Sequence, residues 1–147
     1  MNFSDWLLIS TLVFAWYHVG FVWLVQVVCW PLFAYVGPKE FNDYHQAWWR
    51  GIRYILFVPS ALTFVGAILL LHWTPSGVPH WILWIALAQY ILTYVLTAVW
   101  WGPQQAKLTR TDTPQFALIN KTHWVRAALV TGYGVFMLAA LIFRMAL

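Results

Sequence analysis

Four long apolar stretches, separated by shorter polar segments, run through the sequence and cover residues 6–33, 51–72, 80–101 and 123–146. Each provides the roughly 20 apolar residues that a helix needs to cross the hydrocarbon core of a bilayer. The first stretch is longer than this, so its helix must tilt, kink near Pro31 or protrude from the membrane. The pattern predicts an all-α fold, an integral membrane four-helix bundle formed by a single transmembrane domain.

The connections between the stretches predict an up-and-down order. Residues 73–79 form a tight turn rich in Pro and Gly, which makes the second and third helices antiparallel neighbours. The other two connections, residues 37–50 and 102–122, are longer and polar. All four helices are therefore expected to alternate in direction.

A short pattern occurs twice along the chain. The first and third spans end with Trp shortly before Pro, at residues 30–31 and 101–103. After each polar connection a Trp-x-Arg sequence follows, at residues 48–50 and 124–126. Parallel repeats of this kind are related by an axis along the membrane normal. Two explanations stay open: a chance match in a Trp-rich chain, or a duplicated helical hairpin. The second would place polar side chains near residue 45 opposite those near residue 123.

Composition and charge agree with a membrane protein. Hydrophobic residues make up 63% of the chain and charged residues only 8%, far from the balance of a soluble domain. Seven of the eight Lys and Arg residues lie in or beside the two longer connections, and only Arg144 lies at the other end. The positive-inside rule then predicts a multi-pass protein of the inner (plasma) membrane with both termini outside the cytoplasm. Because the basic residues flank apolar spans, nucleic acid is not an expected partner.

Several kinds of chemistry lack the residues they need. The single Cys29 excludes an internal disulfide and every CxxC motif. The four acidic residues, Asp5, Glu40, Asp43 and Asp112, do not occupy positions that the pattern predicts to be buried. Phosphate-binding loops, paired carboxylates and HExxH are absent from the sequence. No metal site is predicted.

His18 lies in the middle of the first span, where an imidazole is costly unless it finds a partner inside the bundle. As a haem ligand it would need a second axial group at similar depth, and only Met137 qualifies. We favour no haem and no other cofactor. His18 is then a packed side chain bonded to one of three polar residues of the third span: Gln89, Tyr90 or Tyr94.

The most polar stretch close to lipid is residues 118–126, Leu-Ile-Asn-Lys-Thr-His-Trp-Val-Arg. Thr122 is predicted as the N-cap of the last helix, so that His123 and Arg126 share a face on its first turns. We predict a pocket there with His123 and Arg126 as catalytic residues. Its substrate-binding residues are the polar and aromatic side chains nearest the same membrane boundary: Tyr44, His45, Arg50, Trp101, Gln104 and Asn120.

Two interpretations of this cluster stay open. The first interpretation is a binding site that combines an imidazole, a guanidinium and amides with surrounding aromatic side chains. Such a site suits an apolar aromatic ligand with one oxygen that carries negative charge. Alternatively, Arg50, Arg53 and Arg126 form a rim that binds lipid phosphates while the Trp residues anchor the interface.

The order of certain residues resembles a family of small four-helix bacterial membrane proteins of unknown function, which is similar in turn to the anthrone-oxygenase-like membrane proteins. The resemblance spans residues 15–140. Two positions depart from it: His123 stands where that family has Asn, and Gln104-Gln105 follows Pro103 where a His is common. The positions that carry the resemblance are Gln26, Pro31, Leu32, Phe33, Phe41, Tyr44, His45, Pro59, Pro103 and the Trp-x-Arg of residues 124–126.

The resemblance implies a four-helix fold and an oxidation that needs no metal or flavin. In such chemistry a base removes a proton beside a carbonyl group, and the enolate reacts with oxygen. His123 would be the base and Arg126 the group that stabilises the enolate. One hypothesis is thus a cofactor-independent oxidoreductase or binding protein for a lipophilic aromatic or quinone-like compound. The alternative is a non-enzymatic helical subunit that packs against partner subunits in a larger membrane assembly.

Overall fold

The computed structural model describes residues 1–146 of the chain. Within this part 84% of the residues are helical and there is no strand. Four continuous helical segments are apolar and long enough to cross a membrane, which confirms the predicted all-α four-helix bundle. In chain order the elements are α1 (Phe3–Leu24), η1 (Val25–Cys29), α2 (Trp30–Phe33), α3 (Phe41–His72), α4 (His80–Leu96), η2 (Thr97–Trp101), α5 (Gly102–Ala106) and α6 (Pro114–Met145).

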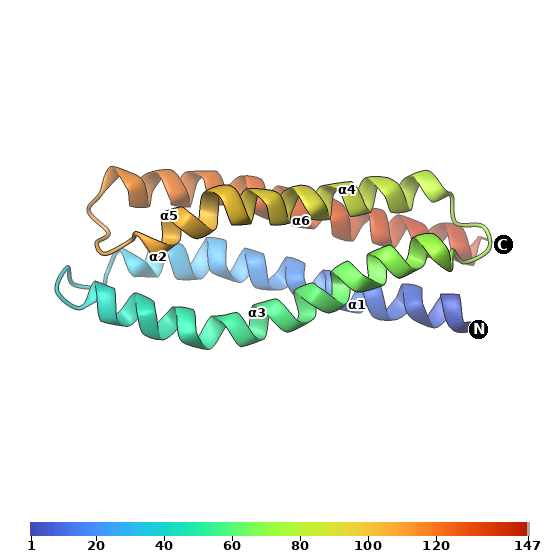
Figure 1. The fold of residues 1–147 in the computed structure, drawn as a ribbon, viewed down its shortest axis with the longest axis horizontal. Helices are drawn as coiled ribbons and strands as arrows, with labels where there is room; N and C mark the ends of the chain where they lie inside the picture. The colour runs from blue at the N-terminus through green and yellow to red at the C-terminus, as the bar shows by residue number, and fades with distance from the viewer. Residues whose placement is uncertain (147) are drawn as a thin grey trace.

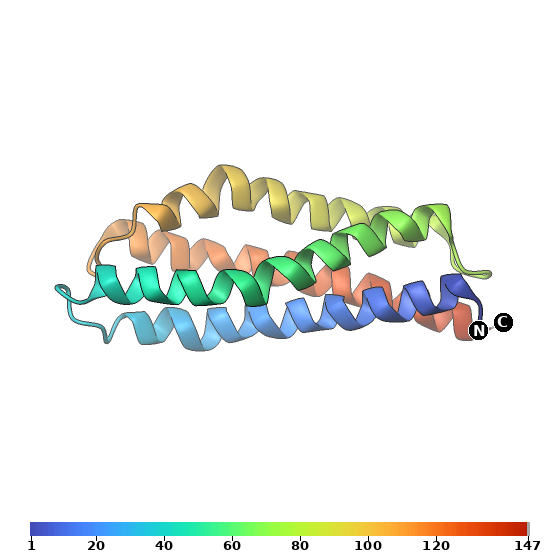
Figure 2. The ribbon, with the colours of Figure 1, turned by 60° about the horizontal axis from the view of Figure 1, so that its bottom comes forward.

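The four segments run up and down side by side (Figure 1). Helix α1 packs against α3 and α6, and α4 packs against α6 and α3, so each long helix has two neighbours. Both termini lie at the same end as the turn between α3 and α4, which we call the terminal end (Figures 1 and 2). The connections at residues 34–40 and 107–113 lie at the opposite end, the loop end.

The terminal end is closed by an ion pair between α1 and α6. Arg144 donates from its Nε to Oδ1 of Asp5 at 2.6 Å and from a second nitrogen to Oδ2 at 3.2 Å. Asp5 also belongs to the capping box that Asn2 forms at the start of α1. The expectation that no acidic residue is buried is wrong for Asp5, because its partner lies 139 residues away and local pattern does not reveal it.

Two helices begin earlier than their apolar stretches. Helix α3 starts at Phe41 instead of residue 51, and α6 starts at Pro114 instead of residue 123. Thr113 caps α6 by accepting from the backbone N–H of Phe116, so the prediction of Thr122 as N-cap is wrong. The Thr122 hydroxyl instead donates to the carbonyl of Leu118 inside the helix. The candidate residues of α6 therefore lie several turns inside the bundle, Arg126 about 18 Å from the helix start.

The first and third segments share an irregularity. Each contains a π-helical turn that ends two residues before a proline, η1 before Pro31 and η2 before Pro103. The residue before each proline donates its N–H five residues back, Trp30 to Val25 and Gly102 to Thr97. A proline ring clashes with the carbonyl four residues earlier in an α-helix, and the wider turn relieves this clash. Both irregular turns adjoin the same part of α6.

Packing divides the bundle into an apolar terminal half and an aromatic loop end. The terminal half is filled by residues such as Leu8, Leu70 and Met137, and the loop end by Trp30, Phe33 and their neighbours. Between the two clusters lie buried polar side chains from all four segments. These polar side chains form the candidate site.

Outside the helices, Arg110 holds Asp112 in the loop before α6 through a bond of 2.8 Å from its Nε. Hydrogen bonding to this guanidinium lowers the pKa of the Asp112 carboxyl. The pair is exposed, so its effect on stability is small.

Candidate functional site

His123 on α6 is the buried centre of a hydrogen-bonded group that joins the first and last helices. Its Nδ1 lies 2.7 Å from Oε1 of Gln26, which comes from the π turn η1. The Gln26 amide nitrogen donates in turn to the side-chain oxygen of Asn120 at 3.1 Å and is 3.4 Å from the Asn120 carbonyl. His123 and Gln26 are both almost fully buried, at 1% and 3% exposure. The π turn thus brings a distant amide to the imidazole.

These contacts determine the form of the His123 ring. The Asn120 carbonyl can only accept a hydrogen bond, so the Gln26 nitrogen faces it and the Gln26 oxygen faces His123. That oxygen can only accept, so Nδ1 carries a hydrogen, and in the neutral ring Nε2 then keeps its lone pair. A neutral imidazole with a free Nε2 has the form required of a general base.

Arg126 lies one turn further along α6, inside the bundle. Its Nε is buried and has no hydrogen-bond partner. It lines a small cavity of about 20 Å³ together with His123 and Gln105, and a second of about 50 Å³ on the side of His18. Neither cavity is lined by Asp or Glu, and the ion pairs of residues 1–146 do not include Arg126. A guanidinium at membrane depth with no carboxylate beside it requires another partner.

A second polar layer lies on the far side of Arg126. The His18 Nδ1 is 2.7 Å from the Tyr90 hydroxyl, one of the three partners that the sequence left open. Ser60 approaches the same imidazole nitrogen at 3.4 Å. His18 is therefore bonded inside the bundle, between α1, α3 and α4, and it lines the same small cavity as Arg126.

His45 lines a third cavity, of about 160 Å³, toward the loop end. The His45 ring is stacked between Phe41 and Trp48, is only 4% exposed, and neither nitrogen has a hydrogen-bond partner. Trp49 and Gln105 line this cavity and also the cavity beside Arg126. Buried polar atoms without partners usually indicate water or a ligand. His45 and Arg126 therefore border adjoining spaces with unsatisfied hydrogen-bonding groups.

Aromatic rings enclose His123. Trp30 lies against it at 5.8 Å between centroids and Trp101 edge-on at 6.4 Å. The Trp101 ring nitrogen donates to the Thr122 hydroxyl at 3.3 Å, while that of Trp30 is buried without a partner. The surroundings of His123 are therefore apolar except for a few directed polar atoms.

The structure brings together some of the predicted site residues. His123, Arg126, Asn120 and Trp101 lie in one group, and His45 lines the adjoining cavity. The remaining three lie elsewhere: Tyr44 is exposed against Phe33, Arg50 is exposed on α3, and Gln104 accepts a hydrogen bond from Gln115 at 2.9 Å.

The alternative rim of three arginines is not complete, because Arg126 does not belong to it. Arg50 and Arg53 are exposed on α3, and Arg53 binds its neighbour Tyr54, while Arg126 points into the bundle. The difference arises because α6 begins nine residues before the predicted start, at Pro114 instead of residue 123, and carries Arg126 deeper.

Three kinds of site residue were not predicted. Gln26 is not among the predicted substrate-binding residues, and its contact with His123 depends on η1. Gln105 takes the place expected for Gln104, because the π turn η2 adds a residue to the helical register. Trp48 and Trp49 are not among the predicted site residues, yet both line the cavity beside Arg126.

Within residues 1–146 no group of three or more His, Cys, Asp or Glu side chains is placed to hold a metal ion. The assembled chemistry is instead one neutral imidazole, one unpaired guanidinium and several amides in an apolar surround. Comparison with known protein families, curated proteins and solved structures finds no match for this chain. The function has to be argued from the site itself.

Proposed function

We propose that this membrane protein binds a lipophilic aromatic carbonyl or quinone-like compound, with the ligand oxygen beside Arg126 and His123. The observation that carries the proposal is the Arg126 guanidinium, which lies inside the bundle with a buried, unpartnered Nε and no carboxylate in its cavities.

An anionic or strongly polarised oxygen is the partner that this site lacks. Leaving a buried donor without an acceptor costs roughly 1–3 kcal/mol, and more for a charged group. A hydrogen bond from Arg to an ionised oxygen is about twice as strong as a neutral one. The apolar surround of Trp30 and Trp101 favours a ligand whose remaining surface is aromatic or aliphatic.

The pair also suits proton abstraction beside a carbonyl group. Gln26 keeps the lone pair of His123 on Nε2, so this nitrogen can take a proton from carbon. Arg126 would stabilise the negative charge that then develops on the carbonyl oxygen. With oxygen as the oxidant, anthrone would give anthraquinone and water. The same two residues would thus serve a cofactor-independent oxidoreductase as well as a binding protein.

The test uses anthrone as the probe, with the protein in lipid nanodiscs. The anthrone enolate absorbs at longer wavelength than anthrone because its conjugation extends over all three rings. Wild-type protein at neutral pH should produce this absorption under nitrogen, and admission of oxygen should convert it to anthraquinone. Arg126→Leu and His123→Gln should each reduce the enolate signal at least tenfold.

Arg53→Leu is the matched control, since it removes an exposed arginine of α3 and the same unit of charge. It should leave the enolate signal unchanged. An enolate signal that falls equally in Arg53→Leu and Arg126→Leu, or that never appears in the wild type, would contradict the proposal. The second candidate function, a subunit of a larger assembly, would then account better for the buried cluster as a packing feature.

A further inference from the structure

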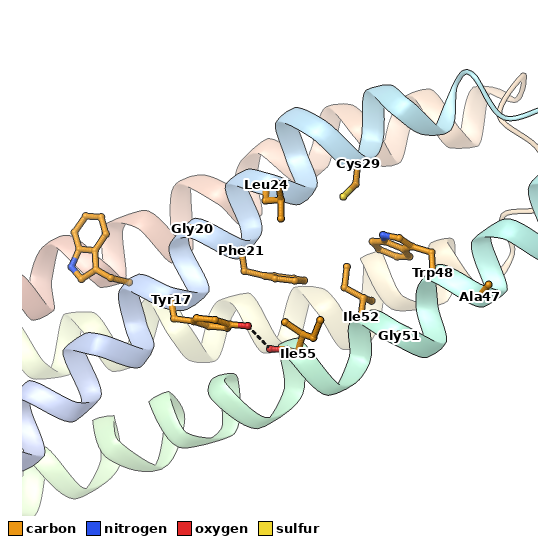
Figure 3. A pocket seen from close by; sticks show the side chains of 11 residues that line it. Tyr17, Gly20, Phe21, Leu24, Cys29, Ala47, Trp48, Gly51, Ile52 and Ile55 are labelled. Atoms are coloured by element: carbon orange, nitrogen blue, oxygen red, sulfur yellow. Dashed lines mark hydrogen bonds between the residues drawn. The ribbon is translucent and has the colours of Figure 1, made fainter.

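An apolar groove lies between α1 and α3 on the surface of the bundle (Figure 3). Its volume is about 720 Å³, within the range of sites for drug-sized ligands. The Tyr17 hydroxyl contacts the Ile55 carbonyl at 3.4 Å across one end of the groove. The lining side chains are mainly aromatic and aliphatic: Trp16, Tyr17, Phe21, Leu24, Trp48 and Ile52, with Cys29, Ile55 and small residues between them.

The groove has open space that packing does not use. Gly20 on α1 and Gly51 on α3 both line it, and a Cβ built at either position meets no atom within 4 Å. By contrast, a Cβ at Gly66, elsewhere on α3, would lie 2.2 Å from the Thr11 side chain. Gly66 is needed for close helix packing, whereas Gly20 and Gly51 leave a hollow.

The hollow adjoins the cavity of Arg126. Phe21, Trp48 and Ile52 line both the groove and that cavity, so one layer of side chains separates them. Figure 3 shows Phe21 and Ile52 reaching toward each other from the two helices, with Trp48 beside them. The cavity itself has room for about one water molecule. A rotamer change of Phe21 or Trp48 would be the shortest way to connect the two spaces.

We propose that the groove holds the aromatic body of a lipophilic carbonyl compound that enters from the membrane, with its oxygen directed past Phe21 toward Arg126. This rests on the proposed function and identifies where the bulk of the ligand lies. The groove adjoins the cavity of an unpaired guanidinium. This favours an aromatic carbonyl compound over a lipid acyl chain, because the hydrocarbon of an acyl chain has no polar group to bind the guanidinium. The exposed aromatic side chains of Trp16 and Tyr17 at the groove suit a planar molecule.

Benzophenone tests the groove directly, because it is an aromatic ketone that inserts into nearby C–H bonds on irradiation. Wild-type protein in liposomes is irradiated with benzophenone, and the adducts are mapped by mass spectrometry. They should concentrate on Leu24, Ile52 and Ile55, and excess anthrone should reduce them. Gly51→Leu and Gly20→Leu each add a side chain to the hollow at a position where a Cβ meets no atom within 4 Å, and they should lower the groove adducts at least fivefold. Ala61→Leu, an exposed position of α3 outside the groove, is the control and should change nothing.

Adducts spread evenly over the lipid-facing surface, or unaffected by Gly51→Leu, would overturn the groove as the binding site. These outcomes are independent of the anthrone enolate signal. If Arg126→Leu lowers the enolate signal but Gly51→Leu does not, the proposed function is supported and the groove is not the binding site.

Discussion

Helix α6 carries two arginines whose surroundings differ completely. Arg144 at the terminal end makes two hydrogen bonds to Asp5, a carboxylate that is 5% exposed. Arg126, 18 positions earlier, lies deeper in the bundle and lacks a carboxylate in either of its cavities. Arg144 connects the first and last helices through its bonds to Asp5, whereas Arg126 has no counter-charge beside it.

The difference distinguishes a buried charge that the fold itself pairs from one that the fold leaves without a counter-charge. A membrane protein tolerates a buried charge when a partner satisfies it, and the partner at the terminal end is part of the fold. At Arg126 the fold supplies imidazole, amides and aromatic rings but no anion. An uncompensated charge is costly, and under the proposed function a ligand oxygen would be its partner.

The largest effect on folding is expected from breaking the paired arginine. Asp5→Asn leaves Arg144 without its counter-charge in a partly buried position, and should lower the free energy of unfolding. Thermal unfolding in detergent measures this. The double variant Asp5→Leu with Arg144→Leu should lose less than Asp5→Asn alone. If Asp5→Asn unfolds at the wild-type temperature, the pair does not stabilise the terminal end.

His18→Ala should cost about 2–3 kcal/mol, because it leaves a space between α1 and α4 and removes the partner of Tyr90. His18→Gln should recover part of this loss, since the amide can still reach the hydroxyl. Both are measured by the same unfolding assay. The absorption spectrum of the wild-type protein supplies a second check, and a Soret band that disappears in His18→Ala would show that the ring binds haem instead.

Gly102→Ala tests whether the π turn positions the site. A Cβ at Gly102 would lie 2.8 Å from the Thr97 carbonyl, so the turn must shift, at a cost of about 1–2 kcal/mol. Gly51→Ala, where a Cβ meets nothing within 4 Å, is the matched control and should change stability little. Because η2 places Gln105 in the cavity, Gly102→Ala should also weaken anthrone binding. Equal stabilities of the two variants would show that a Cβ at residue 102 does not disturb the π turn.

The orientation of the bundle in the membrane determines which end faces the cytoplasm, and chemical labelling can test it. The prediction from basic residues is that Lys39 and Lys107 face the cytoplasm. In a background with Cys29→Ala, Lys107→Cys should not react with a membrane-impermeant maleimide added to intact cells. It should react after lysis. Labelling of intact cells would reverse the predicted orientation.

The four helices and their order could be predicted because each apolar stretch is long and the turn at residues 73–79 is short. The helix starts could not. Residues 41–50 and 114–122 are polar, and a hydropathy pattern marks where lipid begins, not where hydrogen bonding along the helix begins. Thr113 is the cap that the pattern missed, and the error moved His123 and Arg126 to the helix end.

The candidate site was only partly predictable for a related reason. His123 and Arg126 stand out as polar residues among apolar ones, and the structure places them side by side at one cavity. Gln26 lies in the π turn η1 and Gln105 follows the π turn η2. These turns break the 3.6-residue register on which a sequence-based assignment of faces depends. The partnership of Asp5 with Arg144 joins opposite ends of the chain, and no local pattern predicts such a contact.

The most direct test of the central claim is the thermal stability of wild-type protein and Arg126→Leu, each with and without anthrone. A ligand present at about one hundred times its Kd stabilises a protein by about 2.7 kcal/mol. We expect the wild type to gain stability of this order with anthrone, and Arg126→Leu to fold at least as stably as the ligand-free wild type but gain nothing. An Arg126→Leu protein that is destabilised without ligand, or stabilised by anthrone as much as the wild type, would show that Arg126 is a structural residue.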